Sequence, residues 1–136
     1  MSYIGKSFPN LDVKAIDYMG DTFALNILKE ARAKNQKVLL IWYPKDYTSV
    51  CHTELQDFQE ALLDSIPTLL ANDGITTLLD GDHVSYRATY LIDEEGMVFH
   101  EGINHMPLGR NVQEYIRLVD AYSHFQHKGV VCPANW

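Results

Sequence analysis

The apolar positions of the chain predict strands and helices in alternation. Residues 38–43 form a continuous apolar run that Pro44 stops, and such a run is typical of a strand buried on both faces. We expect this strand to be the central one of a sheet. Beyond Thr48, apolar residues recur at steps of four, three and four, namely at Cys51, Leu55, Phe58 and Leu62. That period predicts an amphipathic helix.

A hairpin and a second amphipathic helix are predicted in the latter half of the chain. Residues 86–92 and 97–103 flank the turn sequence Asp-Glu-Glu-Gly, which is the pattern of a β-hairpin. Asn111, with Glu114 three residues later, is a candidate capping pair. The helix that follows would bury Val112, Tyr115, Ile116, Val119 and Tyr122. We expect the tail, residues 124–136, to be irregular.

The other segments have weaker patterns. Residues 8–16 alternate loosely and include Pro9, which suits an edge strand or an extended lead-in. Helix formers at residues 25–31 precede a polar run and predict a short helix. Residues 65–83 hold turn-forming residues and only short apolar runs, so no regular element is predicted there. The order of elements favours a three-layer α/β fold, with residues 1–136 as a single domain.

Composition and charge exclude several function classes. The 136 residues are 46% hydrophobic and 21% charged, close to the averages of globular proteins. The net charge of −7 has the wrong sign for phosphate backbones or anionic lipids, so nucleic acid is not an expected partner. No apolar run approaches the roughly 20 residues that a membrane-spanning helix needs, and the first residues hold no signal-peptide core. We therefore expect a soluble, cytoplasmic protein.

The chain has two cysteines, Cys51 and Cys132, at a spacing that matches neither a disulfide framework nor a zinc motif. In a reducing cytosol such a pair is either inert or catalytic. Thr48 or Ser49 can cap the predicted helix, which places Cys51 in its first turn, among unpaired N–H groups that favour an anionic sulfur. The alternative for a lone cysteine here is a small buried hydrophobe.

The histidines His124 and His127, with Cys132, are the nearest approach to a metal-binding pattern. Structural zinc sites want four ligands at a recognisable spacing, and histidines scattered in a tail are more often solvated. No metal is assigned.

Four stretches of the sequence resemble the peroxiredoxins. The run Trp-Tyr-Pro-Lys-Asp-Tyr-Thr-Ser-Val-Cys-His-Thr-Glu-Leu, residues 42–55, resembles the peroxidatic-cysteine motif of that family. Residues 85–93 look like its arginine-bearing strand, and Pro-Leu-Gly-Arg at 107–110 matches its next landmark. Val-Cys-Pro-Ala-Asn-Trp at 131–136 is similar to the resolving-cysteine motif of the typical two-cysteine subgroup, which includes the bacterial alkyl hydroperoxide reductases. The resemblance implies a thioredoxin-like α/β/α fold, with residues 124–136 as the resolving-cysteine tail.

The resemblance also implies a reaction, the reduction of hydrogen peroxide and organic hydroperoxides. Cys51 would attack the peroxide and become a sulfenic acid, and Cys132 of a neighbouring subunit would condense with it to form a disulfide. Thr48, the Cys51 backbone N–H and Arg87 would be the hydrogen-bond donors, and Pro44 would shield the sulfenic acid. Glu54 and Arg110 would orient Arg87.

Further implications concern partners. No bound cofactor is needed, and thioredoxin or a flavin-dependent reductase would reopen the disulfide. The subgroup forms antiparallel homodimers and often a ring of five dimers.

Ionisation of the thiol alone raises the reaction rate only modestly. A thiol of pKa about 8.5 is already a few per cent thiolate at pH 7, so full ionisation increases the rate at most roughly thirtyfold. Most of the rate must then come from donors that stabilise the transition state.

The chain departs from the family pattern in three places. The stretch that corresponds to residues 62–84 is several dozen residues longer in the family and supplies a further strand and helix. Either the domain is naturally shorter here or the sequence omits residues at this place. Residues 66–71 are a candidate remnant of that stretch. His52 stands where the family usually has proline, and Val130 where it usually has glutamate. The shortened middle motivates a second hypothesis, a non-enzymatic chaperone-like or redox-interaction protein with a malformed active-site loop.

Overall fold

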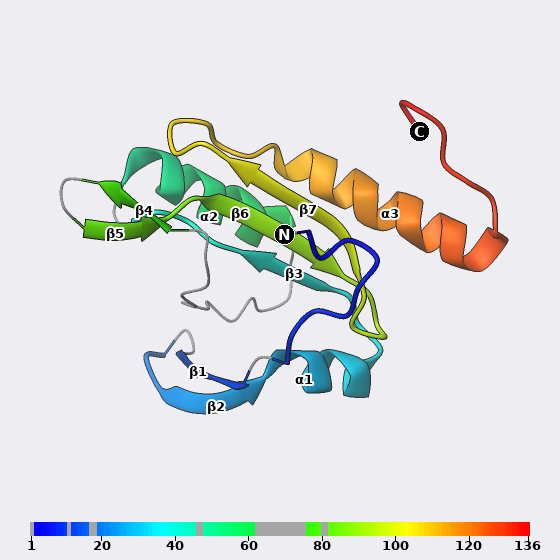
Figure 1. Ribbon diagram of the computed structural model, residues 1–136, viewed down its shortest axis with the longest axis horizontal. Coiled ribbons are helices and arrows are strands. Elements are labelled where there is room, and N and C mark those ends of the chain that lie inside the picture. Colours follow the sequence, from blue (N-terminus) through cyan, green and yellow to red (C-terminus); the bar gives the residue numbers. More distant parts are fainter. Residues whose placement is uncertain (1, 11, 17–18, 46–47, 62–75, 80–81) are drawn as a thin grey trace.

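The computed structural model describes residues 2–10, 12–16, 19–45, 48–61, 76–79 and 82–136 (Figure 1). Its main sheet has three antiparallel strands in the order β3-β6-β7: β3 is Val38–Ile41, β6 is Arg87–Ile92 and β7 is Val98–Asn104. In the described part of the sheet β6 is therefore the middle strand, and β3 lies at an edge. The prediction that the run from Val38 is central is wrong for this part of the chain.

Strand β6 separates two packed layers, because successive side chains of a strand point to opposite faces. All six of its residues are buried. Ala88, Tyr90 and Ile92 face a core that also contains buried side chains from the N-terminal segment, α1, β3 and β7, namely Phe8, Ile27, Leu28, Leu40 and Val98. Arg87 and Thr89 make their contacts on the other face, with α2 and the segment before α3. The fold thus has the three α/β/α layers predicted from the element order.

The N-terminal layer consists of a hairpin and a short helix. Strands β1 (Asp12–Ile16) and β2 (Thr22–Asn26) pair antiparallel, and α1 (Ile27–Lys34) follows at once. Asn26 accepts the Lys29 N–H with its side chain and so caps α1. The predicted helix therefore begins two residues later than its apolar pattern, and Leu25 belongs to β2. The buried positions of α1 are Ile27, Leu28 and Ala31.

Helix α2 (Ser49–Ala61) follows β3, as predicted, with Cys51 in its first turn. Leu62 and the candidate remnant at 66–71 lie outside the described residues. Strands β4 (Thr76–Leu79) and β5 (Asp82–Ser85) pair as a hairpin, in a region where no element was predicted. The sequence did hold a signal for it, because Asp-Gly at 80–81 joins the two strands and is among the strongest hairpin dipeptides.

Helix α3 (Val112–Lys128) is longer than its pattern predicts, so the first five residues of the supposedly irregular tail are helical. Asn111 caps it by accepting the Gln113 N–H, whereas the Glu114 carboxylate bonds Arg117 instead of completing the capping pair. The helix stops at Gly129, whose φ of 67° is left-handed and suits glycine. Val112 is buried, and the other predicted core positions are half-buried. No helix within the described residues has both the length and the apolar character to cross a bilayer.

Candidate active site

Cys51 is held in the first turn of α2 and is only 1% exposed. The helix begins at Ser49, and the Thr48 carbonyl accepts the His52 N–H at 2.9 Å, which closes the first turn around the cysteine. A sulfur buried to this degree is closed to the side chains of other proteins. The position is the one predicted from the helix pattern.

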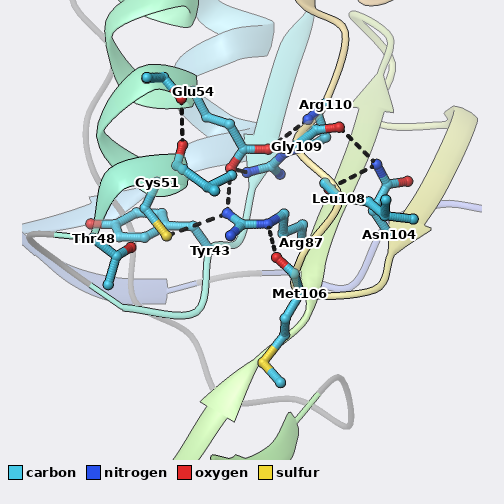
Figure 2. A network of polar contacts seen from close by, with 12 residues as sticks. Tyr43, Thr48, Cys51, Glu54, Arg87, Asn104, Met106, Leu108, Gly109 and Arg110 are labelled. Atoms are coloured by element: carbon cyan, nitrogen blue, oxygen red, sulfur yellow. Dashed lines mark hydrogen bonds and ion pairs between the residues drawn. The ribbon is translucent and has the colours of Figure 1, made fainter.

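Arg87 lies against the sulfur (Figure 2). Its Nη1 donates to Cys51 Sγ at 3.3 Å and to a Glu54 oxygen at 2.7 Å, and its Nε donates to the Met106 carbonyl at 2.6 Å. The residue is 4% exposed, so the guanidinium acts on the sulfur in a place where water screens it little. Sequence reasoning identified Arg87 but missed Met106, because a backbone carbonyl leaves no signature in residue identity.

Glu54 joins Arg87 to a second arginine. Its two oxygens accept the Arg110 Nε at 2.9 Å and the Arg110 Nη2 at 3.1 Å, and the Arg110 backbone N–H at 2.8 Å. Arg110 Nη1 also donates to the Ala88 carbonyl and the Thr89 hydroxyl. Every buried polar side-chain atom in the described part of the chain has a partner. The network therefore holds one carboxylate between two cations, and the role expected of Glu54 and Arg110, to orient Arg87, stays a prediction.

Thr48 has a single hydroxyl hydrogen and two acceptors for it. In the structure the hydroxyl donates to the Lys45 carbonyl at 3.1 Å, and it is also placed to hydrogen-bond the Cys51 sulfur. Since the thiolate is the stronger acceptor of the two, we expect the hydrogen to turn to sulfur when Cys51 ionises.

The pKa of Cys51 is lowered from its ordinary value. Burial opposes this and raises the pKa, but hydrogen bonds from the Thr48 side chain, the Lys45 backbone and Arg87, together with the charge of Arg87, outweigh it. The Lys45 backbone donor was not foreseen, since the sequence analysis named the N–H of Cys51 itself. The site thus favours a thiolate, the reactive form of the residue.

Pro44 and His52 are the two other residues near Cys51 that the sequence singled out. Pro44 lies half-buried in the loop between β3 and α2, where the predicted shielding role remains a prediction. His52, which replaces the usual proline, is exposed, and its backbone N–H donates to the Thr48 carbonyl. A proline has no N–H, so this substitution adds a hydrogen bond to the first turn of α2.

Cys132 lies away from this site. Its Sγ donates to the Ala121 carbonyl of α3 at 3.3 Å, so the tail folds back along its own helix. The Trp136 ring lies 5.2 Å from that of His124. Both cysteines are unpaired. Among the described residues no three histidine, cysteine or acidic side chains gather as a metal site would require.

The premise of a malformed site finds no support in this geometry, because Arg87 of β6 and the loop before α2 both donate to one sulfur, and the segment before α3 supplies an acceptor to Arg87. Nothing in the arrangement favours the chaperone-like alternative.

Comparison with known proteins supplies the family. The AhpC/TSA family matches residues 4–68. Alkyl hydroperoxide reductase C of Helicobacter pylori is 32% identical over 148 residues, which cover 80% of this chain and 74% of that protein. The mitochondrial thioredoxin-dependent peroxide reductase of Drosophila melanogaster is 29% identical over 168 residues, covering 94% and 71%. Those 168 aligned positions exceed the 136 residues of this chain, so the relative carries residues that are missing here.

The fold agrees with the sequence comparison. The reduced 2-Cys peroxiredoxin of Plasmodium vivax superimposes with a TM-score of 0.80 at 29% identity, over 100% of this chain and 90% of that one. The expected thioredoxin-like fold is thereby confirmed. On sequence, fold and the cysteine motif together, this chain belongs to the AhpC/TSA family, the peroxiredoxins, which are thiol-dependent peroxidases.

Proposed function

We propose that this peroxiredoxin reduces hydrogen peroxide and organic hydroperoxides with Cys51 as its nucleophile and Cys132 as its resolving cysteine. The observation that carries the proposal is the contact of the Arg87 guanidinium with a buried Cys51 sulfur whose pKa is lowered. That combination supplies both a thiolate and a fixed donor beside the place where a peroxide must sit.

The reaction balances in two steps. The Cys51 thiolate attacks the terminal oxygen of the hydroperoxide, the O–O bond breaks, and Cys51 becomes a sulfenic acid. The leaving alkoxide or hydroxide takes a proton and departs as alcohol or water. Negative charge moves from sulfur to the peroxide oxygens in this step, and Arg87 and Thr48 are positioned to stabilise it. The Cys132 thiol then attacks the sulfenic sulfur, forms the disulfide and releases water.

The geometry of α3 supports a disulfide between two chains rather than within one. Arg110, hydrogen-bonded to Glu54 one turn from Cys51, lies just before α3, and a Cβ added to its neighbour Gly109 would lie 3.4 Å from the Val50 side chain. The 17 residues of α3 then extend about 25 Å. The four residues from Gly129 to Cys132 return at most about 14 Å, whereas bridged cysteines need Cα atoms within about 7 Å.

Figure 1 illustrates this separation, because the start of β6 and the end of β7 lie at one end of the molecule and the C-terminus at the other. A neighbouring copy of the chain can present its tail without unwinding α3. A homodimer is therefore part of the proposal, and a ring of five dimers is its larger form. The first turn of α2 must still open, because Cys51 is buried.

A dithiol protein of the thioredoxin type, or a flavin-dependent reductase, would complete the cycle by reducing the disulfide. The Drosophila relative named above, a thioredoxin-dependent peroxide reductase, supports the first choice. We place the activity in the cytoplasm, because a catalytic thiol with a single partner cysteine suits a compartment that keeps thiols reduced.

The proposal is tested by treating the reduced parent, Cys51→Ser and Cys132→Ser with hydrogen peroxide. We expect the parent to consume peroxide and to form a disulfide-linked dimer on a non-reducing gel. Cys132→Ser should stop at a sulfenic acid, seen by intact mass as one added oxygen. Cys51→Ser should neither consume peroxide nor form the dimer. Equal peroxide consumption by Cys51→Ser and the parent would refute the role of Cys51.

A further inference from the structure

Asn104 is the last residue of β7 and stands directly opposite Arg87 in the β6–β7 register. Side chains at opposed positions of an antiparallel pair project to the same face. Both residues therefore point toward the segment that connects β7 to α3, residues 105–111. Neither the cysteine motif nor the predicted charge network includes Asn104.

The side chain of Asn104 closes this connecting segment. Its Nδ2 donates to the Leu108 carbonyl at 3.2 Å and to the Gly109 carbonyl at 3.3 Å (Figure 2). One backbone bond, from the Leu108 N–H to the His105 carbonyl at 2.9 Å, holds the turn inside the segment. Since the segment has no helix or strand of its own, the two hydrogen bonds from the Asn104 amide are among the main contacts that fix its conformation.

The same segment fixes the active site at two points. Its Met106 carbonyl accepts the Arg87 Nε, and the Arg110 N–H donates to Glu54. The segment also passes close to the nucleophile, because a Cβ added to Gly109 would lie 3.4 Å from the side chain of Val50, the residue before Cys51. A shift of the segment therefore moves an acceptor of Arg87 and the carboxylate that shares its Nη1.

We propose that Asn104 is a positioning residue for Arg87. It acts through the connecting segment, holding the Met106 carbonyl where it aims the guanidinium at the Cys51 sulfur. The inference rests on the proposed function, in which Arg87 stabilises both the thiolate and the transition state. Hydrogen-bond geometry of this kind is sensitive, since a misplacement of about 1 Å can cost up to a hundredfold in rate.

The test uses Asn104→Ala in a Cys132→Ser background, so that Cys51 is the only thiol. The rate of iodoacetamide alkylation is measured across pH, which gives the pKa of Cys51 without any peroxide. We expect the midpoint to move upward, because part of the Arg87 stabilisation is lost. The second-order rate with hydrogen peroxide should fall roughly tenfold. Asn104→Ser, whose hydroxyl is too short to reach both carbonyls, should shift both quantities in the same direction.

Asn111→Ala is the matched control. It removes an amide from the same connecting segment and costs stability through the lost cap of α3, but Asn111 makes no contact with Arg87 or Glu54 among the described residues. It should leave the Cys51 midpoint and the peroxide rate unchanged. If Asn111→Ala and Asn104→Ala shift them equally, the effect is one of stability and the proposal is wrong.

A double-mutant cycle tests the route of action. In an Arg87→Ala background, Asn104→Ala should cause no further shift of the Cys51 midpoint. A full additional shift would overturn the proposal, since Asn104 would then act on Cys51 by another path. The alkylation results can be told apart from a failure of the proposed function. A parent that does not reduce peroxide would contradict that function, whereas the alkylation midpoint would still report on the positioning of Arg87.

Discussion

Arg87 distributes its donors among a thiol, a carboxylate and a carbonyl, and the three acceptors come from two separate parts of the chain. Cys51 and Glu54 belong to α2, and Met106 to the segment after β7. A guanidinium has a fixed planar fork, so two contacts determine where the third donor points. The sulfur therefore receives a donor whose direction the protein has already set before any peroxide arrives.

Replacing Arg87 by alanine should raise the pKa of Cys51, because both its hydrogen bond and its charge are lost. As pH rises through that pKa the reactive thiolate appears, so the rate–pH curve of the variant should lie at higher pH than that of the parent. The maximal peroxide rate, above both midpoints, should also fall by about 10² to 10³. Stopped-flow kinetics across pH measure both effects.

Arg87→Lys is the informative companion variant. An ammonium keeps the charge but cannot reproduce the fork, so it should recover part of the pKa shift and little of the maximal rate. A lysine variant as fast as the parent would show that charge alone, without direction, is what the site needs.

At this scale the sequence predicted the side chains and missed the backbone. The side chains identified from motifs lie together, namely those of Cys51, Thr48, Glu54, Arg87 and Arg110. Met106 and Lys45 were not, because they act through main-chain groups that any residue carries. Asn104 was missed for another reason, since its bonds are made to carbonyls four and five residues away in a segment without a repeating pattern.

The end of the sheet far from Cys51 is held by one buried carboxylate. Asp93, 3% exposed, accepts the N–H groups of Glu95 and Met97 within the β6–β7 turn and the hydroxyl of Tyr122 from α3. Burial, with this hydrogen bond and the negative charge of Asp93, raises the pKa of Tyr122 to about 12. The hydroxyl thus stays a donor, and α3 is tied to the turn.

Tyr122→Phe should lower the free energy of unfolding by about 2 kcal/mol, because a buried carboxylate oxygen loses its donor. Urea denaturation measures the loss. The Cys51 alkylation midpoint should stay unchanged, since none of the contacts that Tyr122 makes with described residues reaches the site. Tyr115→Phe, on the same helix, is the control and should cost less; equal costs would mean that the bond to Asp93 contributes nothing.

Elements with strong local signals were the ones predicted correctly. The periodicity of α2, the apolar strand β6 and the Asn111 cap each depend on residues near in sequence. The place of β3 in the sheet and the extra length of α3 depend on what packs beside them. The apolar run from Val38 indicates a buried strand, but it does not indicate how many neighbouring strands that strand has. The hairpin β4–β5 was missed although its Asp-Gly dipeptide was visible, because the runs beside it are only four residues long.

At the scale of the whole molecule, α3 leads away from Cys51 over a greater distance than residues 129–132 can span on the way back. An intersubunit disulfide follows if Cys132 resolves the sulfenic acid. Among the described residues, the contacts that define the site come from α2 and the loop before it, from β6 and from the segment before α3.

Mixing Cys51→Ser with Cys132→Ser and adding peroxide tests this arrangement directly. Each chain then holds one half of the disulfide, so a covalent dimer joined by a single bridge should form, visible on a non-reducing gel and by intact mass. Neither variant alone should give it. A parent that forms its disulfide within monomers, with no covalent dimer from the mixture, would contradict the geometry proposed for α3.

The central claim is that Arg87 and Thr48 stabilise the peroxide transition state, beyond favouring the thiolate. The measurement that tests it is the pair of second-order rates of Cys51 with hydrogen peroxide and with iodoacetamide at pH 7, each divided by the rate of free cysteine. Ionisation speeds both reactions alike and by at most roughly thirtyfold. We predict that the peroxide ratio exceeds the alkylation ratio by at least about a hundredfold. Two equal ratios, both within thirtyfold, would show that Cys51 is only an ionised thiol and that the account is wrong.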